Sequence, residues 1–220
     1  MRFDKILWNL SGQQIEDESL KRINLEMECY KFINEEWIVA RRLIHTTADF
    51  EIINDLFFRN NPIESCIKAL KDGVPIYTDS NMIKSGISVA KLKKFNADYE
   101  RESIHCYIAD PEVAETAKRL NITRALAGVR KAKKILDGGI FLCGNAPLAL
   151  AGTVKMIVED GILPALIIGM PVGFVNVIES KELLREITVP HITIEGRRGG
   201  SPLAVAALHG IIEGYLKLRC

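Results

Sequence analysis

The sequence lacks the features that mark several common classes of protein. Its five cysteines are odd in number and far apart, without the Cys-x-x-Cys spacing of zinc and redox sites. They are Cys29, Cys66, Cys106, Cys143 and Cys220. We therefore expect reduced thiols, a cytoplasmic protein and no metal site. No uncharged stretch is as long as the about 20 residues of a membrane-spanning helix, and residues 1–8 carry charge within an apolar stretch, so no membrane association is expected.

An excess of charge is also missing. Lys and Arg total 29 against 28 Asp and Glu, so the basic surface of a nucleic-acid-binding protein is not expected, and any anion must be bound by local groups. The chain has no Gly-x-x-x-x-Gly-Lys phosphate loop, no Gly-x-Gly-x-x-Gly, no His-Glu-x-x-His and no Gly-x-Ser-x-Gly. These absences remove support for nucleotide enzymes, zinc proteases and esterases.

What the chain does have is enough apolar material for a full core. Its 220 residues are 48% hydrophobic, which predicts one domain over residues 1–220. The first 60 or so residues look helical, with Asn34 as a cap for a helix that runs to about Ile44 or His45. The next helix is capped by Asn61, has Pro62 in its first turn and is ended by Gly73.

From Pro75 onward, strands and helices alternate. The expected strands cover residues 76–78, 103–108, 140–143, 166–168 and 191–194. The expected helices lie near Met82, after Asp110, from Thr123 to Asp137, and from Pro147, Ser180 and Ser201. This alternation predicts an α/β fold with a mostly parallel sheet, helices on both faces and an N-terminal helical segment.

Three glycine-containing loops follow expected strands, at Gly144–Pro147, Gly169–Gly173 and Gly196–Ser201. In parallel sheets ligands bind at the carboxyl ends of the strands, so these loops predict a binding crevice. The alternative for each single loop is that glycine and proline serve turn geometry alone.

The last expected helix, residues 203–218, is apolar nearly all round, which requires burial inside the domain or against a second copy in a homodimer.

His45 is the histidine of most interest. It lies near the end of a predicted helix, where the helix dipole favours the imidazolium and Asp49 is close enough to bond it, whereas Arg41 and Arg42 oppose the charge. It is either a general acid or a surface histidine that caps the helix. His105, His191 and His209 fall in apolar strands or helices, which favours core or interface roles.

Cations at helix starts indicate an acidic ligand. Arg197 and Arg198 precede Ser201, the expected cap of the last helix, and a guanidinium beside helix amides suits a carboxylate or phosphate. The alternative is a solvated arginine. Arg124 begins another helix, where a positive charge opposes the dipole. From the residues alone, the chain suits an enzyme acting on a polycarboxylate, such as an isomerase.

Several segments together resemble the precorrin-8X methylmutase family of cobalamin biosynthesis. The most specific is the run from Gly169 to Lys181, Gly-Met-Pro-Val-Gly-Phe-Val-Asn-Val-Ile-Glu-Ser-Lys. The loops at Gly144 and Gly196, the segments Arg42–His45 and Asn121–Arg124, and Ser19, Asp79, Met82 and Gly86 also match. Leu148 and His209 depart from the family pattern, which has a small polar residue and an asparagine there.

The resemblance implies a homodimeric α/β isomerase that moves a methyl group from C11 to C12 of a polycarboxylate tetrapyrrole, precorrin-8X or its cobalt form, without a cofactor. It implies that His45 is the general acid. The implied substrate-binding residues are Ser19, Arg42, Asp49, Arg124, Asn145, Gly173, Arg197 and Ser201. Thr46–Asp49 looks more like the branch that handles cobalt. The main rival hypothesis is a non-catalytic corrinoid carrier; a doubly wound kinase or dehydrogenase is disfavoured by the missing phosphate loop.

Overall fold

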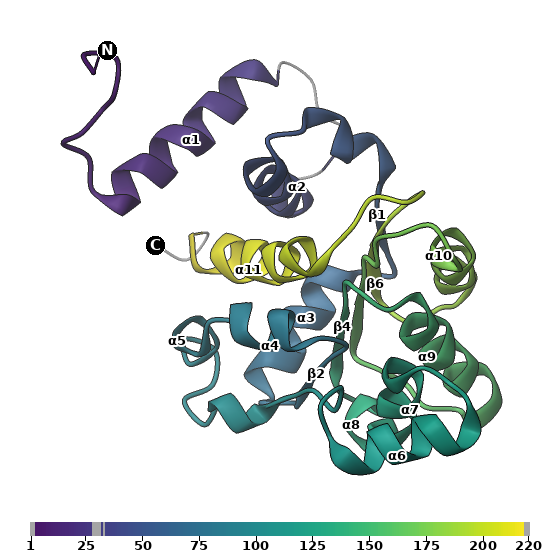
Figure 1. The fold of residues 1–220 in the computed structure, drawn as a ribbon. Coiled ribbons are helices and arrows are strands. Elements are labelled where there is room, and N and C mark those ends of the chain that lie inside the picture. Colours follow the sequence, from purple (N-terminus) through teal and green to yellow (C-terminus); the bar gives the residue numbers. More distant parts are fainter. Residues whose placement is uncertain (1–2, 28–31, 33, 218–220) are drawn as a thin grey trace.

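The computed structural model describes residues 3–27, 32 and 34–217, and it centres on a six-stranded sheet (Figure 1). The strands are β1 (Leu56–Arg59), β2 (Ile76–Thr78), β3 (Ile104–His105), β4 (Ile140–Cys143), β5 (Leu166–Gly169) and β6 (His191–Ile194). Their order across the sheet is β1, β6, β5, β4, β2, β3. β1 runs antiparallel to β6 and the remaining pairs are parallel. The expected α/β fold with a mostly parallel sheet is confirmed.

Helices cover both faces of this sheet (Figure 1). They are α1 (Gly12–Glu26), α2 (Asn34–Thr47), α3 (Pro62–Lys71), α4 (Asn81–Gly86), α5 (Val89–Leu92), α6 (Pro111–Leu120), α7 (Arg124–Lys131), α8 (Lys133–Leu136), α9 (Pro147–Asp160), α10 (Val177–Glu186) and α11 (Ser201–Lys217), with short 3₁₀ turns η1 (Phe50–Asp55) and η2 (Arg101–Ser103). Helices α2, α3, α4 and α11 lie on one face, and α7 to α10 lie on the other.

The strands are apolar because both of their faces are covered. Every residue of β4 is buried, and successive side chains enter different cores. Ile140 and Leu142 belong to the core beneath α2 and α11, whereas Phe141 and Cys143 belong to the core beneath α9. Continuous apolar runs of this kind are typical of parallel strands with helices on both sides.

Helix α11 is buried within this chain. It packs on α2, α3, α4 and the sheet, and eleven of its residues are buried. The close approach to α2 depends on Gly210, because a Cβ there would lie 3.0 Å from the Cα of Val39. Of the two possibilities for this helix, burial inside the domain is the one observed, so its apolar character does not require a second copy.

Some expected boundaries were wrong. The N-terminal region expected to be helical contains the edge strand β1, which pairs antiparallel with β6. The strand expected over 103–108 is limited to Ile104–His105, because the chain turns where the Asp110 N–H bonds the carbonyl of Tyr107. The helix expected from Ser180 begins at Val177, and the Ser180 hydroxyl donates to the carbonyl of Val177 inside it.

Helix ends also differ in detail. Helix α2 continues to Thr47, and Ala48 in the left-handed region ends it. The long helix expected from Thr123 to Asp137 breaks at Ala132 into α7 and α8. Asn61 precedes α3 as expected, but its side chain makes no capping bond. At α11 the N–H groups of Leu203 and Ala204 bond the carbonyl of Gly200, so Ser201 is the first helical residue and not the cap.

Helix α1 lies at the edge of the molecule, packed on α2 (Figure 1).

Among the described residues, none of the helices has the length and hydropathy to cross a membrane. Residues 161–178 carry no charge, yet they form β5, its flanking loops and the first two residues of α10. Cys66, Cys106 and Cys143 are free thiols, and Cys29 and Cys220 lie outside the described residues.

Candidate active site

A buried carboxylate organises the loop after β4. Asp79 follows β2 and is 3% exposed. Its oxygens accept backbone N–H groups of Gly144 at 3.2 Å, Asn145 at 2.8 Å and Ala146 at 2.6 Å. The thiol of Cys143 donates to the same carboxylate at 3.3 Å, and burial followed by the nearby Asp79 charge raises the thiol pKa. Asp79 thus fixes the start of the loop that carries Asn145.

The loop after β6 fits against the other two loops with no room for side chains at two positions. A Cβ on Gly144 would lie 2.7 Å from the backbone of Ser201. A Cβ on Gly199 would lie 2.3 Å from the carbonyl oxygen of Met170. The N–H of Gly200 donates to that carbonyl at 2.8 Å. The expected meeting of glycine-containing loops at the carboxyl edge is confirmed, and close backbone packing is one reason for the glycines.

Lys181 of α10 holds the loop after β6 by hydrogen bonds to its backbone. Its side chain is 1% exposed, and its ammonium donates to the carbonyl oxygens of Gly196 at 2.9 Å and Arg198 at 2.6 Å. Burial lowers the pKa of this ammonium to about 8. Lys181 is the last residue of the run from Gly169 that carries the family resemblance. A lysine suits this position because its ammonium bonds two carbonyl oxygens of the loop at once.

A cleft opens between the end of α2 and the start of α11. Its volume is about 310 Å³, and its walls are Arg42, Thr46, Met82, Gly86, Ser201, Pro202, Val205, Ala206 and His209. We call it the α2–α11 cleft. The Ser201 hydroxyl lies 3.0 Å from the hydroxyl of Ser80, which follows β2. The cleft therefore joins the carboxyl edge of the sheet to the helix that carries His45.

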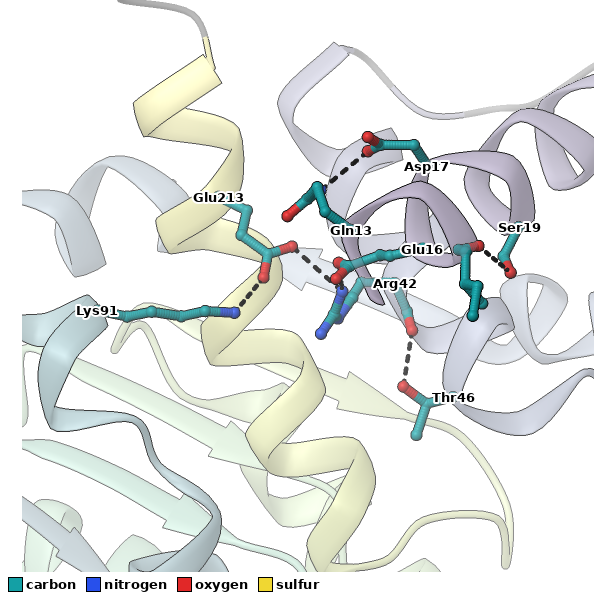
Figure 2. Close-up of polar contacts among 9 residues, drawn as sticks. Gln13, Glu16, Asp17, Ser19, Arg42, Thr46, Lys91 and Glu213 are labelled. Carbon is teal, nitrogen blue, oxygen red and sulfur yellow. Dashed lines mark hydrogen bonds and ion pairs between the residues drawn. The ribbon is translucent and has the colours of Figure 1, made fainter. Parts of the chain in front are cut away.

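Arg42 is the centre of an ion-pair network at this cleft (Figure 2). Its guanidinium pairs with Glu16 of α1 and, at 3.4 Å, with Glu213 of α11. Glu213 also pairs with Lys91 of α5. The hydroxyl of Thr46 donates to the carbonyl of Arg42 at 2.8 Å. The network consists of two cations and two carboxylates, so its formal charge is zero.

His45 lies in the last turn of α2, half-buried and next to the cleft residue Thr46. Asp49 does not bond its imidazole. The Asp49 carboxylate instead accepts the N–H of Glu51 at 2.9 Å and pairs with Arg198 at 3.3 Å. The bond between His45 and Asp49 that the sequence suggested is therefore absent, because Asp49 caps the 3₁₀ turn η1.

A second hollow lies at the carboxyl edge, beside the loop that follows β4. Its volume is about 360 Å³, and Arg124 and Asn145 line it together with the start of α9. Nearby, the N–H of Gly173 bonds the carbonyl of Arg197 at 3.4 Å, and the Arg197 guanidinium lies 5.3 Å from the ring centre of Phe174. We call this the α7–β4 hollow.

The structure thus brings the expected site residues into separate groups. Arg42 and Ser201 share the α2–α11 cleft, Arg124 and Asn145 share the α7–β4 hollow, and Gly173 contacts Arg197. Ser19 lies on α1, where its hydroxyl donates to the carbonyl of Ile15 at 2.8 Å (Figure 2). Among the described residues, no group of three His, Cys, Asp or Glu side chains is placed to hold a metal ion.

Sequence reasoning missed the carboxylates that pair with Arg42, since Glu16 and Glu213 were not singled out. His209, expected in the core or at an interface, is buried and also lines the cleft. The spacing of His209 and Glu213, four residues apart on an otherwise apolar helix, was the available signal. A larger hollow of about 710 Å³ lies between α7, α9 and α10, but it contains none of the expected site residues.

Fold and site together define an α/β protein with two hollows at the carboxyl edge of a mostly parallel sheet, the usual place for a small-molecule site. The profile of the precorrin-8X methylmutase family matches residues 14–214. The chain belongs to this family and is an isomerase of cobalamin biosynthesis.

Individual relatives agree with the family. The chain is 46% identical over 182 residues to a cobalt-precorrin-8 methylmutase of Methanocaldococcus jannaschii, covering 83% of this chain and 81% of the relative. It is 43% identical to the enzyme of that name from Priestia megaterium, covering 90% and 86%. The solved structure of a precorrin-8X methylmutase from Thermus thermophilus superposes with a TM-score of 0.83 at 43% identity, covering 92% and 95%.

Proposed function

We propose that the chain, acting as a single domain over residues 1–220, moves a methyl group from C11 to C12 of cobalt-precorrin-8 and yields cobyrinate. The C11–methyl bond breaks and the C12–methyl bond forms, so the atoms of substrate and product are the same. The cobalt form is preferred because the relatives at 46%, 43% and 42% identity bear the name cobalt-precorrin-8 methylmutase. The name precorrin-8X methylmutase is borne by relatives at 33% and 31% and by the solved structure at 43% identity.

The observation that carries this proposal is the position of the α2–α11 cleft. The turn of α2 that holds His45 forms one of its walls, through Arg42 and Thr46, and the start of α11 forms another through Ser201. His45 therefore lies beside this cleft, and the cation Arg42 lines it. Its volume of about 310 Å³ is at the small end of the roughly 300–1,000 Å³ of ligand sites, so the macrocycle extends beyond it toward the other polar groups of the carboxyl edge.

In this mechanism His45 donates a proton or a hydrogen bond to the macrocycle. Withdrawal of electron density from the conjugated ring eases the migration of the methyl group, and no covalent enzyme intermediate forms. Ser19, Arg42, Asp49, Arg124, Asn145, Gly173, Arg197 and Ser201 bind the substrate in this proposal. The binding energy of the peripheral carboxylates holds the reacting carbons in place.

The proposal includes a homodimer. The loop between β5 and α10 presents apolar side chains to solvent, among them Phe174 at 83% exposure, and Val172 and Val175 are also exposed. Contiguous exposed apolar side chains are typical of protein interfaces. Sedimentation at micromolar concentration is expected to show a dimer, and a monomer alone would contradict this part of the proposal.

The test of the reaction is a product assay with both substrates. The purified protein is incubated with cobalt-precorrin-8 and, separately, with precorrin-8X, and the absorption spectrum is followed because the methyl shift alters the conjugated system. Conversion of the cobalt form with the higher kcat/KM supports the proposal. A spectrum that shows binding without conversion of either substrate would instead identify a corrinoid carrier.

A further inference from the structure

His209 is a buried imidazole with one nitrogen engaged by the backbone. It lies on α11 and is 8% exposed. The N–H of Ser88 points at its Nε2 over 3.2 Å. A nitrogen that accepts a hydrogen bond carries no proton, so the neutral ring has its proton on Nδ1. The contact with Ser88 therefore selects the tautomer.

The surroundings of His209 keep this ring neutral. Burial, followed by the charges of Lys91 from α5 and Arg42 from α2, lowers its pKa to about 4. Glu213, one turn further along α11, is committed to the same two cations. At neutral pH the ring is therefore a hydrogen-bond donor through Nδ1 and has no proton to give up as an acid.

The Nδ1 atom is the free end of the ring. It has no hydrogen-bond partner among the described residues. It is nevertheless not fully enclosed by protein atoms, so part of its surface is open to solvent. His209 is one of the residues that line the α2–α11 cleft. The two side-chain hydroxyls that line the cleft already form hydrogen bonds, Thr46 with the carbonyl of Arg42 and Ser201 with the hydroxyl of Ser80. The cleft thus contains an unused, oriented donor.

The charges around the cleft indicate which kind of group the Nδ1–H of His209 binds. Arg42 and Lys91 are balanced by Glu16 and Glu213, so an anion in the cleft is not held by net charge. A directional N–H donor without a competing acceptor is satisfied by an oxygen that only accepts, such as a carboxylate. Hydrogen bonds to a charged acceptor are also the stronger ones.

We propose that His209 is a substrate-binding residue, which donates its Nδ1–H to a peripheral carboxylate of the corrinoid in the α2–α11 cleft. This role rests on the proposed function of the cleft and adds a binding residue to it. His209 positions the substrate, whereas the acid chemistry belongs to His45.

Two substitutions separate the two ends of the ring. His209→Gln places an amide oxygen near the position of Nε2, where it accepts the Ser88 N–H, but it removes the donor at the position of Nδ1. His209→Asn keeps an N–H near Nδ1 and gives up the bond to Ser88. With cobyrinate as the titrant in calorimetry, we expect His209→Gln to bind on the order of 10-fold more weakly or worse, and His209→Asn to bind within a few-fold of the parent protein.

The outcomes are distinguishable. Equal affinities of His209→Gln and a parent protein that binds cobyrinate would overturn the role of His209 and leave the proposed function standing. A parent protein that neither binds cobyrinate nor converts substrate would remove both. Nitrogen-15 NMR of the imidazole in the free protein is an independent check: we expect the Nδ1-protonated tautomer, and an Nε2-protonated ring would overturn the proposal without any reference to activity.

Discussion

The loops at the carboxyl edge and the N-terminal helices are held by different kinds of contact. At the loops, buried groups bond backbone atoms: Asp79 accepts three N–H groups and Lys181 donates to two carbonyls. Helix α1, in contrast, joins Arg42 through Glu16, an ion pair whose Glu16 side chain is 33% exposed. Buried, fully satisfied networks fix geometry, whereas a single part-buried ion pair that water still reaches contributes less. The loops are therefore fixed in one shape and α1 is attached less firmly, whereas α2, which supplies the reacting group in the proposed function, packs closely on α11.

The largest expected effect concerns the reacting group. His45→Ala is expected to lower kcat by about 10²–10⁴-fold, the usual contribution of a general acid, with cobyrinate affinity and Tm close to those of the parent. His45→Gln, which donates a hydrogen bond but no proton, separates the two modes of assistance. Single-turnover spectroscopy measures both. Parent rates in His45→Ala would remove this residue from the mechanism and with it the chemical half of the comparison.

The next effect concerns the rigid half. Asp79→Ala leaves three N–H groups without their acceptor, of which that of Gly144 is buried, and each charged hydrogen bond is worth about 1.5–3 kcal/mol. We expect a loss of at least about 3 kcal/mol in the free energy of unfolding, measured with urea. Asp98→Ala, at an exposed carboxylate, is the matched control and is expected to change little. If the two variants lose equal stability, the Asp79 network does not hold the loops.

A third effect is a pH dependence of stability, which we expect from His209 of α11. Its pKa is lowered from the usual 6.5 to about 4 by burial, Lys91 and Arg42. The neutral ring is favoured in the folded state, so its stabilisation is fully present above pH 6.5 and is lost as the pH falls toward 4. Relative to His209→Gln, which does not titrate, the parent is expected to lose about 3 kcal/mol between pH 7 and pH 4. A constant difference would show that the ring titrates alike in both states.

A smaller effect is expected at the rim of the carboxyl edge. Arg197→Ala is expected to weaken cobyrinate binding by about 1.5–3 kcal/mol if its guanidinium bonds a carboxylate, with Tm unchanged because the side chain is exposed. Arg198→Ala is the matched control, since Arg198 pairs with Asp49, Glu51 and Asp55. Calorimetry compares them, and equal affinities would assign Arg197 to the solvated surface.

The difference between the two regions also decided what could be predicted from sequence. Strands β4, β5 and β6 and the starts of α6, α7 and α9 were predicted because apolar runs, caps and prolines are local signals. Strand β1 was missed because an edge strand of four residues pairs with β6, which is more than a hundred residues away.

The same distinction applies to the site. Arg42, Ser201 and the glycine-containing loops could be found from motifs and from the family resemblance. Glu16 could not, because a carboxylate on a helix surface has no local mark that it will meet Arg42 of another helix, and Glu213 had only its spacing from His209 as a signal. The bond from Ser88 to His209 joins residues 121 positions apart, and only the fold shows it.

The smallest expected effect tests the exposed half of the comparison. Glu16→Gln removes the ion pair to Arg42, but Glu213 still compensates the guanidinium, so the loss in unfolding free energy is expected to be at most about 1 kcal/mol. The loss is also expected to shrink in 1 M salt, where the screening length is about 3 Å. Glu18→Gln is the control on the same helix, because Glu18 pairs only with Arg22 among the described ion pairs and both side chains are exposed. A loss as large as that of Asp79→Ala, unaffected by salt, would mean that α1 is fixed as firmly as the loops, and the contrast between the two regions would fail.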